Sequence, residues 1–413
     1  MMNKICSFCE KSDLHEIIDF GKVALAGGFI KKNEIKNEPK FTLRVFFCVN
    51  CYAVQIIDKV DQDLLFKNYY YFSSFINTLK THFEDYASYV VERFIEVPNN
   101  STVVEFGCND GVLLNPLSKK NIKNLIGVDP ATNIVNQIKI KNVNIINNFF
   151  NVEIANQISD KYDKADLILA NNVFAHIPDI RGTTLAVKNL LKKNGVFVFE
   201  VHYLEKIIGE LQYDMIYHEH LYYYSLISLE NFFSKYNLKI FDIKNIQTHG
   251  GSIRFYVSNT DSIHAKNITN DVKKMRDKEI KNGFNNLEIY KSFSKSVSLL
   301  KTELVSLIID LRKKNKVIAG YGASGRANTV LQYLNITEDS ISYMIDDSPE
   351  KIGLYTPGSN LEIKPRSILL SNNPPDYVIV FAWSFLDEIM KKNLEYLSNG
   401  GRFILPFPKI KIV

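Results

Sequence analysis

The chain has 413 residues, of which 46% are hydrophobic and 23% are charged, and its formal net charge is +5. This length exceeds what one hydrophobic core usually supports, so we expect two or three domains. The basic residues are scattered, which argues against a nucleic-acid partner. The small positive net charge is compatible with a small anionic substrate. No apolar run reaches the roughly 18 residues that span a bilayer, so we expect no membrane partner.

The first 60 residues carry two Cys-x-x-Cys pairs, made by Cys6, Cys9, Cys48 and Cys51. No secretory signal is recognisable, so we expect a cytoplasmic protein, where paired cysteines are more often metal ligands than disulfides. Four thiolates close a tetrahedral shell around Zn²⁺. We therefore expect a zinc-binding module over residues 1–60, irregular in structure and stapled by a structural zinc ion. The alternative is four unrelated buried cysteines.

A polar, aromatic and helical stretch is expected over residues 61–94, and from Ser101 onward strands alternate with helices. This alternation is the signature of an α/β fold with a parallel sheet. The expected strands are Thr102–Phe106, Asn124–Val128, Leu167–Ala170 and Gly195–Val201. We expect this domain to cover residues 61–258, with 61–94 as its helical lead-in.

A glycine-bearing turn over residues 105–111 follows the first of these strands, and the next strand ends at Asp129. Glycine lets a backbone approach a ligand closely, and α/β sheets bind nucleotides at this edge. The turn lacks the second glycine that cradles a dinucleotide pyrophosphate, and an acid at a strand end suits two ribose hydroxyls. The pattern therefore favours S-adenosylmethionine over a dinucleotide, although a turn without a ligand stays open. The expected cofactor-binding residues are Glu105, Gly107, Asn109, Asp110, Asp129, Pro130, Asn171 and Asn172.

Residues 213–224 concentrate two histidines, two carboxylates and five tyrosines, and residues 249–254 add a histidine and an arginine. Histidine is the usual proton acceptor at neutral pH, so this stretch is a candidate site of acid–base catalysis. A second metal site is a rival interpretation, but His218-x-His220 lacks the spacing of the zinc proteases. An aromatic interface segment is a further alternative.

The last part of the chain predicts a second α/β unit. An amphipathic helical region around residues 271–314 precedes strands at Val317–Tyr321, Ile341–Ile345, Tyr377–Phe381 and Arg402–Leu405. Residues 320–325 spell Gly-x-Gly-x-x-Gly, with Asp346 about 20 residues later, which alone favours an NAD-dependent oxidoreductase. We expect a C-terminal Rossmann-like domain over residues 259–413, with residues 259–315 as a helical linker.

Taken together, these motifs resemble those of the three-domain sugar C-methyltransferases, which act on nucleotide-linked 4-keto-deoxysugars. The resemblance runs through nearly the whole chain. It is carried by the two Cys-x-x-Cys pairs, residues 69–74, His82-Phe83, residues 109–111, 171–173, Ala175-His176, 217–220, 249–252, Arg254, 320–323, Asn328-Thr329 and 346–349.

The resemblance implies a mechanism in which a base removes the C3 proton beside the C4 ketone. The resulting enolate then takes the methyl group of S-adenosylmethionine. The catalytic residues it implies are His220 as base, Tyr217 and Glu219 as positioning groups, His176 in the pocket and Tyr71 at the reacting ends. The substrate-binding residues it implies are Tyr69, His249, Ser252, Arg254, Gly322, Arg326 and Asn328.

The sequence departs from the family at three places: His202 stands where proline is usual, Arg326 where lysine is usual, and Cys108 where serine is common. The partner expected is a nucleotide-linked sugar, with the carrier (dTDP, GDP or CDP) left open, and the chain is expected to act as a monomer. The alternatives that remain are an O- or N-methyltransferase of a nucleotide sugar, an NAD-dependent oxidoreductase and a non-catalytic scaffold.

Overall fold

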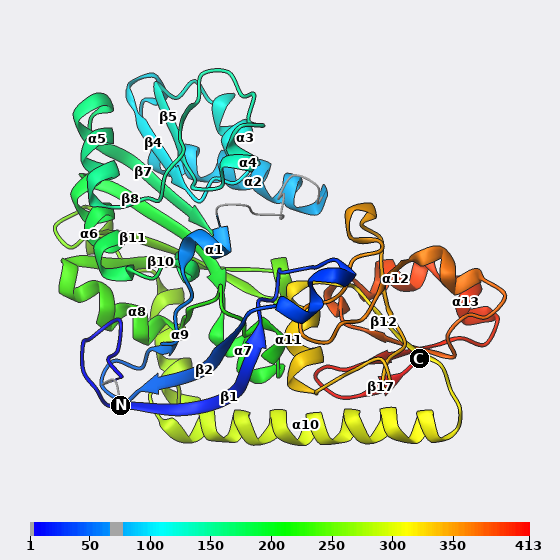
Figure 1. The fold of residues 1–413 in the computed structure, drawn as a ribbon. Coiled ribbons are helices and arrows are strands. Elements are labelled where there is room, and N and C mark those ends of the chain that lie inside the picture. The colour runs from blue at the N-terminus through cyan, green and yellow to red at the C-terminus, as the bar shows by residue number, and fades with distance from the viewer. Residues whose placement is uncertain (1–3, 67–76) are drawn as a thin grey trace. The chain divides into compact units, whose positions relative to one another are not determined.

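The computed structural model describes residues 4–66 and 77–413, which fold into two compact units (Figure 1). Each unit is built from separate stretches of the chain. The first unit contains residues 1–15, 47–204 and 221–287, and the second contains residues 16–46, 205–220 and 288–413. The domain boundaries expected at residues 60 and 258 do not coincide with this division and stay predictions.

The N-terminal segment is not irregular, as the sequence suggested, but forms most of a four-stranded sheet. The strand order is β1-β2-β3-β9, with β1 at Leu14–Ala24, β2 at Lys40–Cys48, β3 at Val54–Ile56 and β9 at Tyr222–Tyr223. The burial pattern along β1 is mixed and lacks the strict alternation of a half-buried strand. For this reason the strand was not recognisable in the sequence.

A seven-stranded sheet forms the centre of the first unit, in the order β10-β11-β8-β7-β4-β5-β6. The four predicted strands are confirmed and the neighbours of β4 on both sides run parallel to it. The chain order reverses between β4 and β7, and ligands bind at such a switch point, outside the carboxyl ends of the strands. The strands are β4 (Thr102–Phe106), β5 (Asn124–Val128), β6 (Asn144–Ile146), β7 (Ala165–Asn171), β8 (Leu191–His202), β10 (Leu238–Ile246) and β11 (Ser252–Asn259).

Helices cover both faces of this sheet (Figure 1). Buried side chains of α2 and α3 pack with those of β4, β5, β7 and β8 in one continuous apolar core, and α5 contacts α6 on the other side. The helices of the first unit are α1 (Gln62–Phe66), α2 (Asn77–Phe94), α3 (Leu114–Ser118), α4 (Thr132–Val135), α5 (Val152–Tyr162), α6 (Ile180–Leu190), α8 (Leu226–Phe233) and α9 (Asn270–Lys281).

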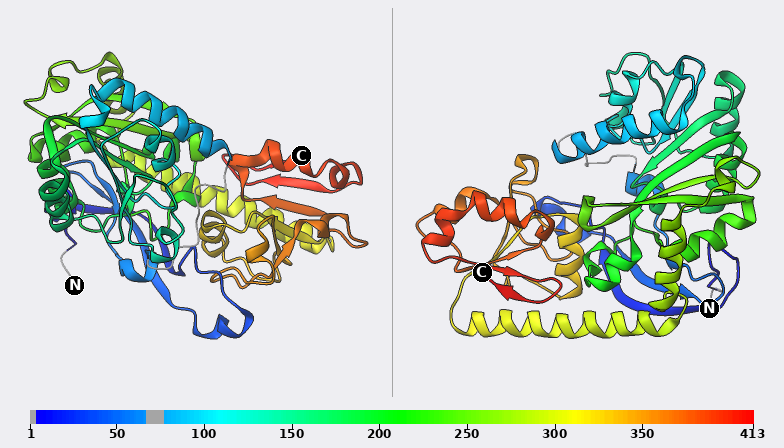
Figure 2. Two further views of the ribbon diagram at one scale, coloured as in Figure 1. Left: turned by 90° about the horizontal axis from the view of Figure 1, so that it is seen from above. Right: turned by 180° about the vertical axis from the view of Figure 1, so that it is seen from behind.

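The second unit contains a six-stranded sheet in the order β14-β13-β12-β15-β16-β17, seen from two sides in Figure 2. Neighbouring strands are parallel except β16 and β17. Four of the strands had been predicted, although β13 begins three residues later than expected. The strands are β12 (Ile318–Tyr321), β13 (Met344–Asp346), β14 (Ile363–Pro365), β15 (Tyr377–Val380), β16 (Arg402–Leu405) and β17 (Lys411–Ile412).

The predicted amphipathic region forms α9 and α10, and α10 extends over Leu287–Lys313. Its buried residues recur at helical spacing, from Tyr290 and Phe293 to Leu311. The remaining helices are α7 (Leu204–Gly209), α11 (Gly325–Tyr333), α12 (Leu386–Lys392) and α13 (Leu394–Ser398). Among the described residues, no helix is both long enough and apolar enough to cross a membrane.

Candidate active site

The four paired cysteines converge on one point in the first unit. Their sulfur atoms all lie within 4.8 Å of one another, and the Sγ–Sγ distance is 3.6 Å for Cys6 and Cys51 and 3.5 Å for Cys9 and Cys48. A disulfide would need about 2.05 Å. Four sulfurs at about 2.3 Å from one zinc ion lie roughly 3.8 Å apart, so the observed spacing suits a tetrahedral Zn²⁺ site.

The surroundings of the sulfurs favour a bound cation. The side chain of Gln55, which is fully buried, donates a hydrogen bond to Cys6 Sγ over 3.0 Å, and the backbone N–H of Phe8 donates to the same atom over 3.4 Å. Hydrogen bonds from Cys48, Cys51 and Gln55 lower the pKa of Cys6 to about 4, whereas Cys48, Cys6 and burial raise the pKa of Cys51. Four crowded thiols cannot all ionise without a positive charge between them.

The turn after β4 has the backbone of a ligand-binding turn. Gly107 has φ +68°, and a Cβ on it would lie 2.5 Å from the side chain of Val173, so only glycine fits. Asp129 closes the turn from the neighbouring strand, since its two carboxylate oxygens accept the backbone N–H groups of Asn109 (2.8 Å) and Ala131 (2.9 Å). Burial raises the pKa of Asp129 despite these bonds. The carboxylate holds the turn, and each oxygen keeps a second lone pair for a ligand.

Buried polar groups gather at the carboxyl ends of β4 and β7, the two strands beside the switch point. Asn171 donates to Glu105 Oε1 over 3.4 Å, while Glu105 Oε2, Asn171 Oδ1 and Asn172 Oδ1 are buried and have no hydrogen-bond partner among the described residues. Burial raises the pKa of Glu105 well above its usual value. Buried acceptors without donors are costly, so this edge fits a ligand that brings hydroxyl or amino groups, as the expected cofactor does.

His176 lies beyond the same edge, in the single 3₁₀ turn Phe174–His176 that follows β7. Its ring stacks on that of Phe66, with centroids 5.8 Å apart and planes 9° apart. Burial lowers the pKa of His176 to about 4, so the imidazole is neutral at physiological pH. It can therefore donate or accept one hydrogen bond but brings no charge.

The segment Tyr217–His220, which carries the expected base, belongs to the second unit. His220 is buried, and its Nδ1 lies 2.7 Å from the backbone carbonyl of Met215. A carbonyl only accepts, so Nδ1 carries the proton and the basic lone pair of the neutral ring is at Nε2. The ring of Tyr217 packs on His220 with centroids 3.9 Å apart. By contrast, His218 is buried with Nε2 3.3 Å from the carbonyl of Phe41, a structural contact.

The turn before the base is held by an ion pair between the buried Asp214 and the partly buried Arg326, which sequence reasoning missed. Asp214 lies in the 3₁₀ turn Tyr213–Met215, and its Oδ2 accepts hydrogen bonds from Arg326 Nε over 2.8 Å and from Trp383 Nε1 over 3.0 Å. The guanidinium of Arg326 also lies over the indole ring, 4.7 Å from its centroid. Arg326, expected as a substrate contact, thus binds Asp214 within the second unit.

Arg254 is likewise engaged inside the first unit. Its Nε donates to Glu200 Oε1 over 2.6 Å, Arg254 and Glu200 are almost fully buried, and the guanidinium lies over the ring of Tyr86. His82 on α2 contacts both carboxylate oxygens, at 3.1 and 3.0 Å. Burial alone would raise the pKa of Glu200, but His82 and Arg254 lower it. This cluster of four residues was not predicted, because its members are far apart in the sequence.

The remaining residues expected at the substrate differ in their surroundings. Gly322 has φ +90°, and a Cβ on it would lie 2.5 Å from that of Ala382. Asn328, on α11, donates to the carbonyl of Ala26 over 2.6 Å, and Ser252, at the start of β11, donates to the carbonyl of Thr248 over 3.2 Å. Their substrate roles stay predictions.

Tyr69 and Tyr71 lie outside the described residues, and nothing is described of the side chain of His249. Glu219 is partly buried, within reach of Gly27. Asp110 and Pro130 lie in the turns that follow β4 and β5. The roles expected for these residues also stay predictions.

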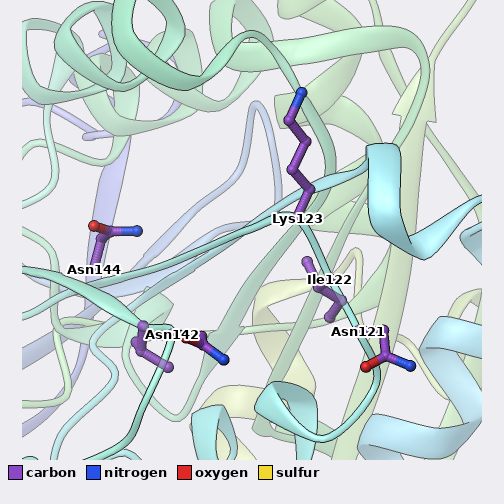
Figure 3. A pocket seen from close by; sticks show the side chains of 6 residues that line it. Asn121, Ile122, Lys123, Asn142 and Asn144 are labelled. Carbon is purple, nitrogen blue, oxygen red and sulfur yellow. The ribbon is translucent and has the colours of Figure 1, made fainter.

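A hollow of about 410 Å³ lies away from these groups, in the first unit (Figure 3). It is lined by the segments that precede β5 and β6, at the amino ends of these strands, which are opposite to the ligand-binding edge. The lining residues are Asn121, Ile122, Lys123, Asn142, Val143 and Asn144. Lysine and asparagine side chains of this kind are usual on a solvated surface.

Three family models match consecutive parts of the chain. Residues 6–66 match a zinc binding domain, residues 79–243 match a methyltransferase domain, and residues 247–408 match a C-methyltransferase C-terminal domain. The C-methyltransferase NovU of Streptomyces niveus is 30% identical over 410 residues, which cover 99% of this chain and 96% of that protein.

Solved methyltransferase structures match less than half of the chain. An S-adenosylmethionine-dependent methyltransferase from Clostridium acetobutylicum is 19% identical, covering 43% of this chain and 92% of that one, with a TM-score of 0.34. The magnesium protoporphyrin IX methyltransferase ChlM of Synechocystis is 11% identical, covering 44% of this chain and 79% of that one, with a TM-score of 0.33.

Proposed function

We propose, on the premise that this chain belongs to the C-methyltransferase family, that it methylates C3 of a nucleotide-linked 4-keto-deoxysugar. The chain is an S-adenosylmethionine-dependent methyltransferase. The sugar acceptor, the carbon and the mechanism are the proposal. The observation that carries it is the hydrogen bond from His220 Nδ1 to the carbonyl of Met215, which places the basic lone pair at Nε2.

His220 removes the proton from C3 of the acceptor. A ketone at C4 acidifies that C–H bond, because the negative charge left on C3 is shared with the carbonyl oxygen. Nε2 takes the proton while Nδ1–H stays bonded to the carbonyl of Met215, which stabilises the imidazolium that forms. Tyr217 packs on the imidazole, which restricts the orientation of the ring, and its phenol is a candidate donor to the developing oxyanion.

Bound S-adenosylmethionine supplies the electrophilic methyl group. On the protein side, Asp129 can accept the ribose hydroxyls, since each carboxylate oxygen has a lone pair beyond its backbone bond. The buried acceptors of Glu105, Asn171 and Asn172 can take the donors of the nucleoside or of the amino-acid part. These groups fit the cofactor by chemistry.

We further propose that Cys6, Cys9, Cys48 and Cys51 hold one structural Zn²⁺. The support is the spacing of the sulfurs and the match of residues 6–66 to a zinc binding domain. Four protein ligands complete a tetrahedral shell, so the ion has no open position for catalysis.

The test is incubation with ¹³C-methyl S-adenosylmethionine and a panel of nucleotide-linked 4-keto sugars, followed by carbon NMR of the product. A new signal in the C–CH₃ region with one of the sugars is expected. A signal in the O–CH₃ region, or no transfer to any keto sugar, would refute the proposed acceptor chemistry.

The role of His220 is tested by exchange of the C3 proton with D₂O in the presence of S-adenosylhomocysteine, which reports the deprotonation alone. His220→Ala should slow the exchange by about 10²–10⁴-fold, the usual contribution of a positioned base. The exposed His15 provides the matched control, since His15→Ala should leave the rate unchanged. Equal rates in wild type and His220→Ala would remove His220 as the base.

A further inference from the structure

We propose that Arg326 and Trp383 are positioning residues for the base: by holding Asp214 they fix the turn whose carbonyl selects the tautomer of His220. This inference rests on the proposed role of His220. It concerns residues of the second unit only, and it assigns a function to the ion pair of the buried Asp214 with Arg326, which takes no part in the reaction itself.

Arg326 and Trp383 together form a strong anchor for the Asp214 carboxylate. Asp214 is almost fully buried, and its Oδ2 receives both Arg326 and the indole N–H of Trp383. A buried carboxylate needs such partners, because leaving it without them costs several kcal/mol. The indole also lies under the guanidinium, so the two donors hold each other in place. The position of Asp214 is therefore set by α11 and by the turn after β15.

A short path leads from Asp214 to the base. Asp214 and Met215 are neighbours in one 3₁₀ turn, in which the N–H of Ile216 donates to the carbonyl of Tyr213 over 3.1 Å. Met215 offers its own carbonyl to His220 Nδ1 over 2.7 Å. A carbonyl at this place accepts only the Nδ1–H form of the ring. If the turn rotates, the hydrogen bond between His220 Nδ1 and the carbonyl of Met215 is lost, and the Nδ1–H tautomer is no longer favoured.

Another side chain of the turn leaves it little freedom. Tyr213 is fully buried, and its ring packs against those of Tyr333 and Phe407, with centroids 5.5 and 5.1 Å away. Tyr333 belongs to α11, the helix that also carries Arg326. The turn is thus held by an apolar contact, by its backbone hydrogen bonds and by the ion pair of Asp214 with Arg326.

The position of Arg326 connects this anchor to the expected substrate site. Arg326 directly follows the glycine turn Gly322–Gly325, where the C-terminal domain is expected to hold the nucleotide of the substrate. The residue is arginine where the resembling family usually has lysine. Arg326 donates from Nε to Oδ2 of Asp214, and a terminal nitrogen lies 2.7 Å from the same oxygen, so the planar guanidinium combines a directed hydrogen bond with its charge.

The test compares Arg326→Met, Arg326→Lys and Trp383→Phe, with Arg366→Met as the matched control. Arg366 pairs with Asp347 in the same unit, but both side chains are almost half exposed. The first readout is ¹⁵N NMR of histidine in the substrate-free protein, which distinguishes Nδ1–H from Nε2–H tautomers. The second is exchange of the substrate C3 proton with D₂O in the presence of S-adenosylhomocysteine.

Wild type and Arg366→Met should show His220 as the Nδ1–H tautomer. Arg326→Met and Trp383→Phe should show a mixture of tautomers and slower exchange, by about 10–100-fold for Arg326→Met, since misplacing a reacting group by about 1 Å can cost 10²-fold. Arg326→Lys should recover part of the rate. Affinity for S-adenosylmethionine should stay within about two-fold of wild type, because the expected cofactor site lies in the first unit.

An unchanged tautomer and an exchange rate within two-fold of wild type in both Arg326→Met and Trp383→Phe would overturn the inference. Trp383→Phe keeps an aromatic side chain and removes the N–H donor together with part of the indole, so it remains informative if Arg326→Met does not fold. A tautomer change without any effect of His220→Ala on exchange would instead show that the anchor exists but that His220 is not the base.

Discussion

The buried pair of Arg254 and Glu200 allows a quantitative prediction about stability. In Arg254→Met the carboxylate of Glu200 keeps His82 as its one charged partner among the described residues, and its side chain is almost fully buried. Removing one partner of a buried ion pair costs about 3–5 kcal/mol. For a domain of roughly 150–250 residues each kcal/mol lowers Tm by roughly 2–4 °C, so Tm should fall by roughly 6–20 °C.

The pH dependence of this loss follows from the pKa of Glu200. In wild type the pKa is lowered by His82 and Arg254 against the effect of burial, so the pair stabilises the fold above the unfolded-state pKa and the stabilisation is lost as pH falls. Without Arg254, burial dominates and the pKa rises. A carboxyl whose pKa is raised in the folded state lowers the free energy of unfolding least at pH values below its unfolded-state pKa and most at pH values above its folded-state pKa. The difference between wild type and variant should therefore be larger at pH 8 than at pH 5.

The assay is equilibrium denaturation in urea at both pH values, followed by circular dichroism. Arg276→Met is the matched control in the same unit, because Arg276 pairs with Glu230 but both side chains are about one quarter to one third exposed. Such pairs contribute about 0–1 kcal/mol. A loss of stability for Arg254→Met no larger than that of the control, or a loss that does not change between pH 8 and pH 5, would show that the pair of Arg254 and Glu200 does not stabilise the fold in this way.

Three further predictions concern the metal, the cofactor and a second buried acid. Cys48→Ser should reduce bound zinc, measured by elemental analysis, from about one ion per chain to nearly none, whereas Cys108→Ser should keep it; a zinc-free wild type would contradict the proposal. Asp129→Ala should weaken S-adenosylmethionine binding by about 10–100-fold in calorimetry, as expected for the loss of a charged acceptor worth about 1.5–3 kcal/mol, whereas the exposed Asp160→Ala should not. Burial raises the pKa of Glu279 to about 7, so its contribution to stability is present below about pH 4.5 and is lost as pH rises through about 7. Glu279→Gln should therefore flatten the decline in the free energy of unfolding between pH 5 and pH 8. An unchanged slope would show that Glu279 does not titrate in this range.

Four strands of each α/β sheet were predicted, because parallel strands with both faces covered are continuous apolar runs. Every residue of β4, for example, is buried, and the expected bounds of β4 and β5 are those observed. The strand β1 was missed because charged and apolar residues alternate irregularly along it, with exposed positions at both ends of a partly buried run. Its pairing with β2 depends on residues that are distant in the sequence, which local periodicity does not report.

The convergence of the four cysteines was also predictable, since each Cys-x-x-Cys turn presents two sulfurs to one point whatever fold brings the pairs together. The side chain that donates a hydrogen bond to this cysteine cluster was not predictable from the sequence. Gln55 lies four positions after Cys51, in the short strand β3, and nothing in its neighbourhood marks it as the donor to Cys6. A buried glutamine in a strand is explained only by a partner that the folded chain supplies.

The roles of Arg254 and Asn328 show where inference from residue type stops. Both are expected to bind substrate from the family resemblance; in the structure Arg254 donates to Glu200 and Asn328 donates to the carbonyl of Ala26, and their substrate roles stay predictions. Residue type states how many donors a side chain has, but not where the fold directs them. Glu200 and Arg254 face each other only through the register of β8 and β11. A variant of either residue that loses substrate affinity would therefore report first on packing, and a role in binding would require that the affinity falls while the free energy of unfolding stays the same.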